Sequence, residues 1–216
     1  IAGQMGSSTM NDSASSEANP LPGVRLTDRQ WRICVDFGTA ASKACLALQG
    51  EWAGDAGRRV KPLAIGKAAG AAEALLTPSA IFIEDDRIYF GPHALKRAAL
   101  NSSEREPLLS FKMLLGAHDL AELLEASVKR SVDPSGKLRN KHILTFYMAY
   151  LGALIETCLA HDADFASIKG EVRWRYSRPE WPNAIAGQHD RITLELFEKA
   201  LEVAHRLRAE LLSEDG

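Results

Sequence analysis

The chain has 216 residues, a formal net charge of −2, 25% charged residues and 46% hydrophobic residues. This composition is typical of a globular protein with one sizeable core or two small ones. The near-balanced charge and the dispersed basic residues argue against a nucleic-acid-binding protein. No run of consecutive apolar residues approaches the roughly 18 that a membrane span needs, and no signal peptide is apparent. We therefore expect neither nucleic acid nor a membrane as a partner.

The beginning of the chain is predicted to be a disordered tail or a tag. Residues 1–24 are rich in Ser, Gly, Asn and Ala and poor in large apolar side chains. Such a segment cannot bury enough surface to offset the entropy lost on ordering. It also contains Met-Gly-Ser-Ser, which is typical of a cloning tag, so the fold is expected to begin near residue 25.

The three cysteines indicate a reducing compartment. Cys34, Cys45 and Cys158 lie in apolar runs and form no Cys-x-x-Cys pair. A free cysteine in such a run behaves as a small hydrophobic residue. This pattern favours a cytoplasmic location.

Short strands are predicted in the first half of the chain. Apolar, β-rich runs bounded by turn residues are expected to form strands at residues 31–38, 43–50, 62–66, 79–84 and 87–91. The first two runs flank a turn of small residues and predict a hairpin. The last two flank Asp85 and Asp86, which are typical turn residues, and predict a second hairpin.

Helices are predicted to dominate the second half. Helical periodicity is found over residues 107–130, 141–161 and 190–212. The first of these is interrupted at Gly116, the second is apolar enough to be buried on most faces, and Asp190 is a candidate cap for the third. Pro92 suits the first turn of a further helix, and a strand within 170–181 should end at or before Pro179. The predicted fold class is therefore mixed α/β.

The turn DFGTAAS, residues 36–42, has the features of a phosphate-binding hairpin loop. Successive backbone N–H groups in a tight turn form an anion-binding concavity, and Gly38 lets the backbone approach a phosphate closely. Asp36 ends the strand and could hold a hydrated Mg²⁺, which usually takes one or two carboxylates. Thr39 and Ser42 add hydroxyl groups. The residues alone leave open a purely structural hairpin, in which Asp36 and Ser42 only satisfy turn amides.

The stretch ICVDFGTAASKACLAL resembles the first phosphate-binding motif of the actin-like ATPase superfamily, and specifically that of the heat shock protein 70 chaperones. Two later stretches are similar to the family in the same order. LLTPSAIFIEDDRIYFGPHALKRAALNSS resembles its Thr-Pro-Ser run with a hairpin and a helix, and LLSFKMLLG resembles its Lys-Arg-Leu-Ile-Gly segment. The resemblance covers residues 32 to about 182.

This resemblance implies an α/β fold. Residues 25–216 would form the N-terminal lobe of an actin-like ATPase domain of ribonuclease H-like architecture, a half-domain with a mixed sheet and flanking helices. A smaller inserted subdomain is expected at about 66–140. No stretch after residue 182 resembles the family's second phosphate loop or its adenosine-binding segment. The isolated chain is therefore expected not to be catalytically complete.

The resemblance also implies roles for individual residues. Asp36 would face Mg²⁺ through water, and Lys112 would be the catalytic lysine near the γ-phosphate of ATP. Pro179 would relay the nucleotide state to neighbouring domains. The backbone amides that would wrap the β- and γ-phosphates are those of Gly38, Thr39, Ala40 and Ala41.

The sequence departs from the family's pattern near the loop and near Lys112, and SRPEWP is a poor copy of the family's Val-Pro-Ala-Tyr around Pro179. Ala40 and Ala41 replace residues that often carry hydroxyl or amide groups, and Met113 stands where the family usually has arginine. Lys112 itself lies between apolar neighbours, where a lysine can simply extend its charged end to solvent.

Two functional classes follow. The first is the N-terminal part of a heat shock protein 70-like chaperone ATPase, which binds ATP or ADP with Mg²⁺ and reaches protein clients or co-chaperones through other domains. The second is a catalytically inactive actin-like scaffold that acts as a protein-interaction module. A filament-forming or sugar-kinase relative shares the first motif, but the Thr-Pro-Ser and Lys-x-Leu-x-Gly blocks argue against it.

Overall fold

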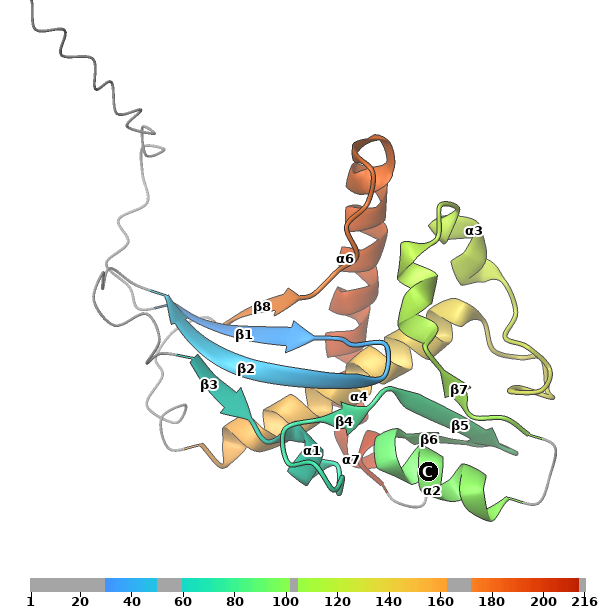
Figure 1. Cartoon of the computed structure of the whole chain (residues 1–216), viewed down its shortest axis with the longest axis horizontal. Helices are drawn as coiled ribbons and strands as arrows, with labels where there is room; N and C mark the ends of the chain where they lie inside the picture. The colour runs from blue at the N-terminus through green and yellow to red at the C-terminus, as the bar shows by residue number, and fades with distance from the viewer. Residues whose placement is uncertain (1–29, 50–59, 102–104, 163–171, 214–216) are drawn as a thin grey trace, which may run out of the picture.

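The structure, a computed structural model, describes residues 30–49, 60–101, 105–162 and 172–213 (Figure 1). It contains a five-stranded mixed sheet, a separate three-stranded antiparallel sheet and helices packed against them. The predicted broad class, mixed α/β with a mixed sheet and flanking helices, is confirmed. The predicted tail at 1–24 lies outside the described residues, and the assignment of 25–216 to a lobe with an insertion at 66–140 stays a prediction.

The first predicted hairpin is present as strands β1 (Gln30–Asp36) and β2 (Ala41–Gln49). Its side chains alternate between the two faces of the sheet, as the strand period of two requires. Ile33, Val35 and Phe37 are buried in the core, whereas the residues between them are only half-buried. The hairpin therefore has one core face and one face open to solvent.

The remaining strands of the large sheet are short. β3 (Val60–Leu63) and β4 (Thr77–Pro78) pair antiparallel with β2 at different points along it. The strand predicted at 62–66 is thus misplaced, because the chain turns into helix α1 (Ile65–Ala68) directly after β3. Leu63 at the end of β3 and Ile65 at the start of α1 are both buried, so the apolar run that predicted one strand spans the end of a strand and the start of a helix.

Strand β8 (Arg173–Tyr176) pairs parallel with β1, with Val35 opposite Tyr176. It ends before Pro179, as predicted. Parallel strands place their carboxyl ends at the same edge of a sheet. The loop that follows β1 and the segment that follows β8 therefore lie next to each other.

The second predicted hairpin consists of β5 (Ala80–Glu84) and β6 (Arg87–Phe90), and β7 (Leu108–Leu109) pairs with β5. Asp85 in its turn has a φ of 55°, a left-handed conformation that aspartate tolerates. Helix α2 (Gly91–Leu100) follows with its proline in the first turn, as predicted, and packs on this sheet.

Four further helical elements flank the central helix that is described below. The region of predicted helical periodicity at 107–130 forms the 3-10 helix η2 (Phe111–Gly116) and helix α3 (Leu120–Glu125), with the expected break after the glycine. Near the carboxyl end lie α6 (Asn183–Arg206) and α7 (Arg208–Leu211). The predicted start of the last long helix is wrong: α6 begins just after Pro182, and Asp190 is an interior position whose carboxylate pairs with Arg178 at 2.6 Å.

Helix α4 (Asn140–Ala160) runs through the centre of the core and packs against α6. Its length and its mean hydropathy of 1.6 over an 18-residue window would allow it to cross a membrane, which the sequence analysis did not anticipate. In the structure, 67% of that window is buried inside the protein. Core helices have the same composition, so this property alone is weak evidence for a membrane.

The close approach of α4 to α6 should depend on Gly152. A Cβ added there would lie 3.1 Å from the Cβ of Ala204 on α6, whereas one added at Gly187 on α6 would meet nothing within 4 Å. We expect Gly152→Leu to force the helices apart and to lower the free energy of unfolding by about 1–3 kcal/mol in urea titrations. The matched control, Gly187→Leu, should keep or raise stability, because leucine favours helix more than glycine does. Equal losses in both variants would contradict this packing.

The turn before α4 should make stability depend on pH. The buried Asp133 carboxylate accepts hydrogen bonds from the backbone N–H of Leu138 at 2.8 Å and from the backbone and hydroxyl of Ser135 at 3.1 and 2.5 Å. Burial acts to raise the pKa of Asp133, but these hydrogen bonds prevail and the pKa lies below its ordinary value of 3.8.

A lowered pKa in the folded state adds stability that is present above the unfolded-state pKa and is lost as pH falls through the folded value. We therefore expect Asp133→Asn to lower the free energy of unfolding by about 1–3 kcal/mol at pH 7 and by less below pH 3.8. Urea titrations at several pH values measure this difference. Asp86→Asn, in an exposed turn, is the control and should leave the free energy of unfolding nearly unchanged at pH 7; a loss for Asp133→Asn that stays constant over these pH values would count against the charged hydrogen bonds.

Candidate functional site

The loop between β1 and β2 lies at the edge of the sheet where β1 and β8 both end (Figure 1). It is tight: a Cβ at Gly38 would collide with the carbonyl oxygen of Ala41, so only glycine fits. Thr39 and Ala40 at its tip are exposed. The backbone of residues 38–41 is thus fixed in shape and open to solvent, as a phosphate-binding loop would need.

Hydrogen bonds from Ser79 hold this loop in place. The Ser79 hydroxyl donates to the carbonyl oxygen of Gly38 at 2.8 Å, and its backbone N–H donates to the carbonyl oxygen of Ala40 at 2.9 Å. Ser79 is buried and also lies 3.1 Å from the buried hydroxyl of Ser42. The carbonyl oxygens of Gly38 and Ala40 therefore each accept a hydrogen bond from the buried Ser79.

Tyr147 on α4 completes a cluster of buried hydroxyl groups. Its hydroxyl donates to the carbonyl oxygen of Pro78 at 3.0 Å and lies 3.3 Å from the hydroxyls of both Ser42 and Ser79. Burial raises the pKa of Tyr147 to about 12, although the two serines act to lower it. The phenol therefore stays protonated and remains a donor at neutral pH.

Asp36 lies at the end of β1 with its side chain about half exposed. Lys43 is directly opposite in the strand register, and the two charged groups are 3.4 Å apart. A half-exposed carboxylate suits contact with Mg²⁺ through water, which is the usual magnesium arrangement with few protein ligands. No group of three or more His, Cys, Asp and Glu side chains that could enclose a metal is found within the described residues.

Lys112 on η2 lies at the same edge. Its ammonium group is 5.8 Å from the centre of the Phe37 ring, within cation–π range, and donates to the Ser177 hydroxyl at 3.4 Å. Ser177 directly follows β8, and its backbone N–H donates to the carbonyl oxygen of Val35 on β1 at 2.8 Å. The side chain of Lys112 is therefore directed toward the end of the sheet.

The position of η2 is set by aromatic and hydrogen-bond contacts. Phe111 packs against Phe37 and Tyr147, with ring centres 5.8 and 4.9 Å apart. The indole N–H of Trp181 donates to the carbonyl oxygen of Leu115 at 2.8 Å. These contacts attach η2 to the hairpin on one side and to the segment after β8 on the other.

A pocket of about 450 Å³ opens on the solvent face of the hairpin next to this edge. Among the described residues that line it, Asp36 is the only one with a carboxylate, while Lys43 and Arg175 carry positive charge. Its lining also includes Ser177, the hydrogen-bond partner of Lys112. The local charge favours an anionic ligand.

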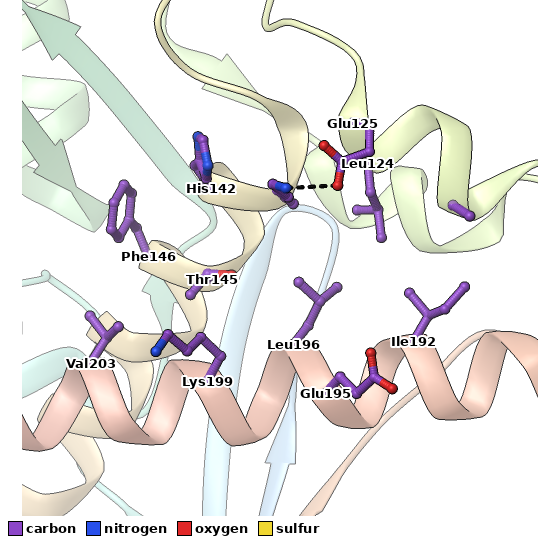
Figure 2. Close-up of a pocket in the computed structure, with 12 residues that line it drawn as sticks. Leu124, Glu125, His142, Thr145, Phe146, Ile192, Glu195, Leu196, Lys199 and Val203 are labelled. Atoms are coloured by element: carbon purple, nitrogen blue, oxygen red, sulfur yellow. Dashed lines mark hydrogen bonds and ion pairs between the residues drawn. The ribbon is translucent and has the colours of Figure 1, made fainter.

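A second pocket, of about 490 Å³, shares no lining residue with the loop (Figure 2). It lies between α3, α4 and α6, and its rim carries the 2.7 Å Glu125–Lys141 ion pair. Figure 2 shows apolar side chains of α6 facing those of α4 and α3. Its apolar lining consists of Ala121, Leu124, Phe146, Ile192, Leu196 and Val203.

The structure thus brings Asp36, the loop residues 38–41 and Lys112 to one edge of the sheet; their roles in binding stay predictions. Sequence reasoning missed the parts played by Ser79, Tyr147 and Ser177. Ser79 belongs to the Thr-Pro-Ser block, whose resemblance to the family was the only feature of the sequence that could have indicated its role. Comparison with known proteins adds nothing here, since no protein-family model and no curated protein matches the chain.

The hydroxyl cluster should determine how rigid the loop is. We expect Ser79→Ala to lower the free energy of unfolding by about 1–3 kcal/mol, because the buried side of the Gly38 carbonyl loses its donor. Amide hydrogen exchange in residues 38–41 should also become faster. Thr39→Ala, at an exposed hydroxyl in the same loop, should change neither quantity. Unchanged exchange in the Ser79 variant would refute the role of the cluster.

Proposed function

We propose that this chain is the nucleotide-binding N-terminal part of a heat shock protein 70-like chaperone ATPase. It binds the phosphates of ATP or ADP, with Mg²⁺, at the loop between β1 and β2. Backbone amides of residues 38–41 contact the phosphates, Asp36 contacts the hydrated Mg²⁺, and Lys112 offsets charge on the terminal phosphate. Protein clients or co-chaperones are recognised by other domains, in a cytoplasmic setting.

The position of Lys112 carries the proposal. A lysine that only extends its charged end to solvent makes no directed contacts with the protein. The Lys112 ammonium group instead lies 5.8 Å from the centre of the Phe37 ring and donates a hydrogen bond to Ser177. This places the ammonium group beside Phe37, the residue that precedes the glycine of the exposed loop. Positive charge beside a tight turn of successive backbone N–H groups is an arrangement that favours phosphate.

Hydrolysis is expected to need groups beyond those gathered here. In the site as proposed, Asp36 is the only carboxylate, and phosphoryl transfer also requires a group that orients the attacking water. We therefore expect this chain to bind nucleotide with little or no turnover.

The alternative, a catalytically inactive scaffold that binds other proteins, is favoured by one observation. The pocket between α3, α4 and α6 is apolar and open, which suits a partner surface (Figure 2). The aromatic residues near β8 support it less. Tyr176 packs on Phe197 with ring centres 3.9 Å apart, and Trp181 is only 6% exposed, so both serve internal packing. Steady ATP turnover by the 216-residue chain would eliminate this alternative.

Calorimetric titration of Mg·ATP into the chain tests the proposed site. We expect Asp36→Ala and Lys112→Ala each to weaken binding about tenfold, or about 1.4 kcal/mol, since each removes a charged contact. Mg·AMP should bind far more weakly than Mg·ATP, because the proposed loop contacts are with the β- and γ-phosphates, which AMP lacks.

Two matched controls separate a local effect from a general change in charge. Asp86→Ala removes an exposed carboxylate from the β5–β6 turn, and Lys129→Ala removes an exposed ammonium group before α4. Both should leave the affinity unchanged. If wild-type affinity persists in the Asp36 and Lys112 variants, the site lies elsewhere; if wild type binds no ATP, this chain alone is not a nucleotide-binding protein.

A further inference from the structure

Cys34 and Cys45 face each other across the β1–β2 hairpin. They are direct partners in the antiparallel register, and both line the pocket on the solvent face of the sheet. Opposite residues in antiparallel strands have Cα atoms about 4.5–5.5 Å apart. A disulfide requires Cα atoms about 4.4–6.8 Å apart, so the backbone already holds the two residues at a suitable separation.

Both cysteines are free thiols and are half-buried rather than enclosed in the core. The pocket of about 450 Å³ gives them access to a small reagent. The third cysteine, Cys158, lies on α4 and lines a different pocket. Cys34 and Cys45 are thus the pair that the fold places together.

The surroundings of the pair are positively charged. Arg175 is the neighbour of Cys34 in the parallel β1–β8 register, and Lys43 lies two residues before Cys45 on β2, on the same face. Both basic residues line the pocket with the thiols, with Asp36 as the one acidic residue there among the described lining. A thiol reagent that carries carboxylates would be attracted to this pocket.

We propose that Cys34 and Cys45 form a redox-active dithiol site that is oxidised to an intramolecular disulfide by an anionic low-molecular-weight disulfide of the glutathione type. The thiolate of one cysteine attacks a sulfur of the reagent, forms a mixed disulfide and releases one reagent thiol. The other cysteine loses its proton and attacks the protein sulfur of the mixed disulfide, which releases the second reagent thiol. The protein loses two electrons and two protons, and the reagent gains both.

The two thiols are close enough to act on each other. Burial raises the pKa of the Cys45 thiol, and the adjacent Cys34 sulfur raises it further, against a smaller lowering by Lys43. Because the two residues are direct cross-strand partners, whichever thiol makes the first attack leaves the other in place for the resolving step. The site does not require nucleotide binding, so its test is independent of the proposed function.

The experiment treats the folded 216-residue chain with excess oxidised glutathione, blocks remaining thiols with a maleimide, and analyses the products by mass spectrometry. Wild type should lose two reactive thiols and retain no glutathione, with a Cys34–Cys45 link in the peptide map. Cys45→Ser should stop at a glutathione adduct on Cys34, and Cys158→Ser should behave as wild type. A stable glutathione adduct on wild type, or a link through Cys158, would overturn the proposal.

The charge of the pocket is tested separately with Arg175→Ala. We expect its oxidation by glutathione disulfide to slow several-fold, while oxidation by neutral hydroxyethyl disulfide keeps its rate. Arg173→Ala, two residues earlier on β8 and outside the pocket lining, is the matched control. An equal slowing with both reagents would show that the arginine does not select an anionic partner. Circular dichroism confirms that each variant is folded.

Discussion

The hydroxyl of Tyr147 is the contact on which the arrangement of the candidate site depends. It joins the central helix α4 to Ser42 on β2 and to the Pro78–Ser79 turn in one buried cluster. In a low-dielectric core an unpaired hydroxyl is costly, so these groups stabilise only the register in which all of them are paired. Ser79 in turn fixes the backbone of the loop between β1 and β2 through its two hydrogen bonds to loop carbonyl oxygens. The tip of that loop is exposed to solvent.

The parallel pairing of β1 and β8 adds the second constraint. Strands far apart in the sequence end together, and the segment after β8 reaches η2 through Ser177 and Trp181. The 3-10 helix is held from two sides, by aromatic packing against Phe37 and by these hydrogen bonds. Lys112 is therefore positioned by contacts that join the hairpin, α4 and the β8–α6 connection.

The sequence predicts local structure well and long-range geometry poorly. Period-two alternation and turn residues located both hairpins, and the apolar run at 141–161 located α4. The start of α6 was misjudged because Asp190 suits a cap, whereas Pro182 ends the extended chain eight residues earlier. The opposition of Cys34 to Cys45 depends on the length of the turn, and the contacts of Ser79 with Tyr147 depend on tertiary packing; neither follows from sequence pattern alone.

The pairing of Asp36 with Lys43 bears on how a nucleotide would approach the loop. An exposed ion pair of this kind contributes only about 0–1 kcal/mol, so either partner is readily exchanged. A phosphate group would attract Lys43 away from Asp36, and the released carboxylate would then face the metal that accompanies the phosphate. Arg175 and Lys112 leave the edge positively charged before that exchange. The lysine opposite Asp36 is thus compatible with the proposed magnesium contact at this loop, because the exposed ion pair offers little resistance to exchange.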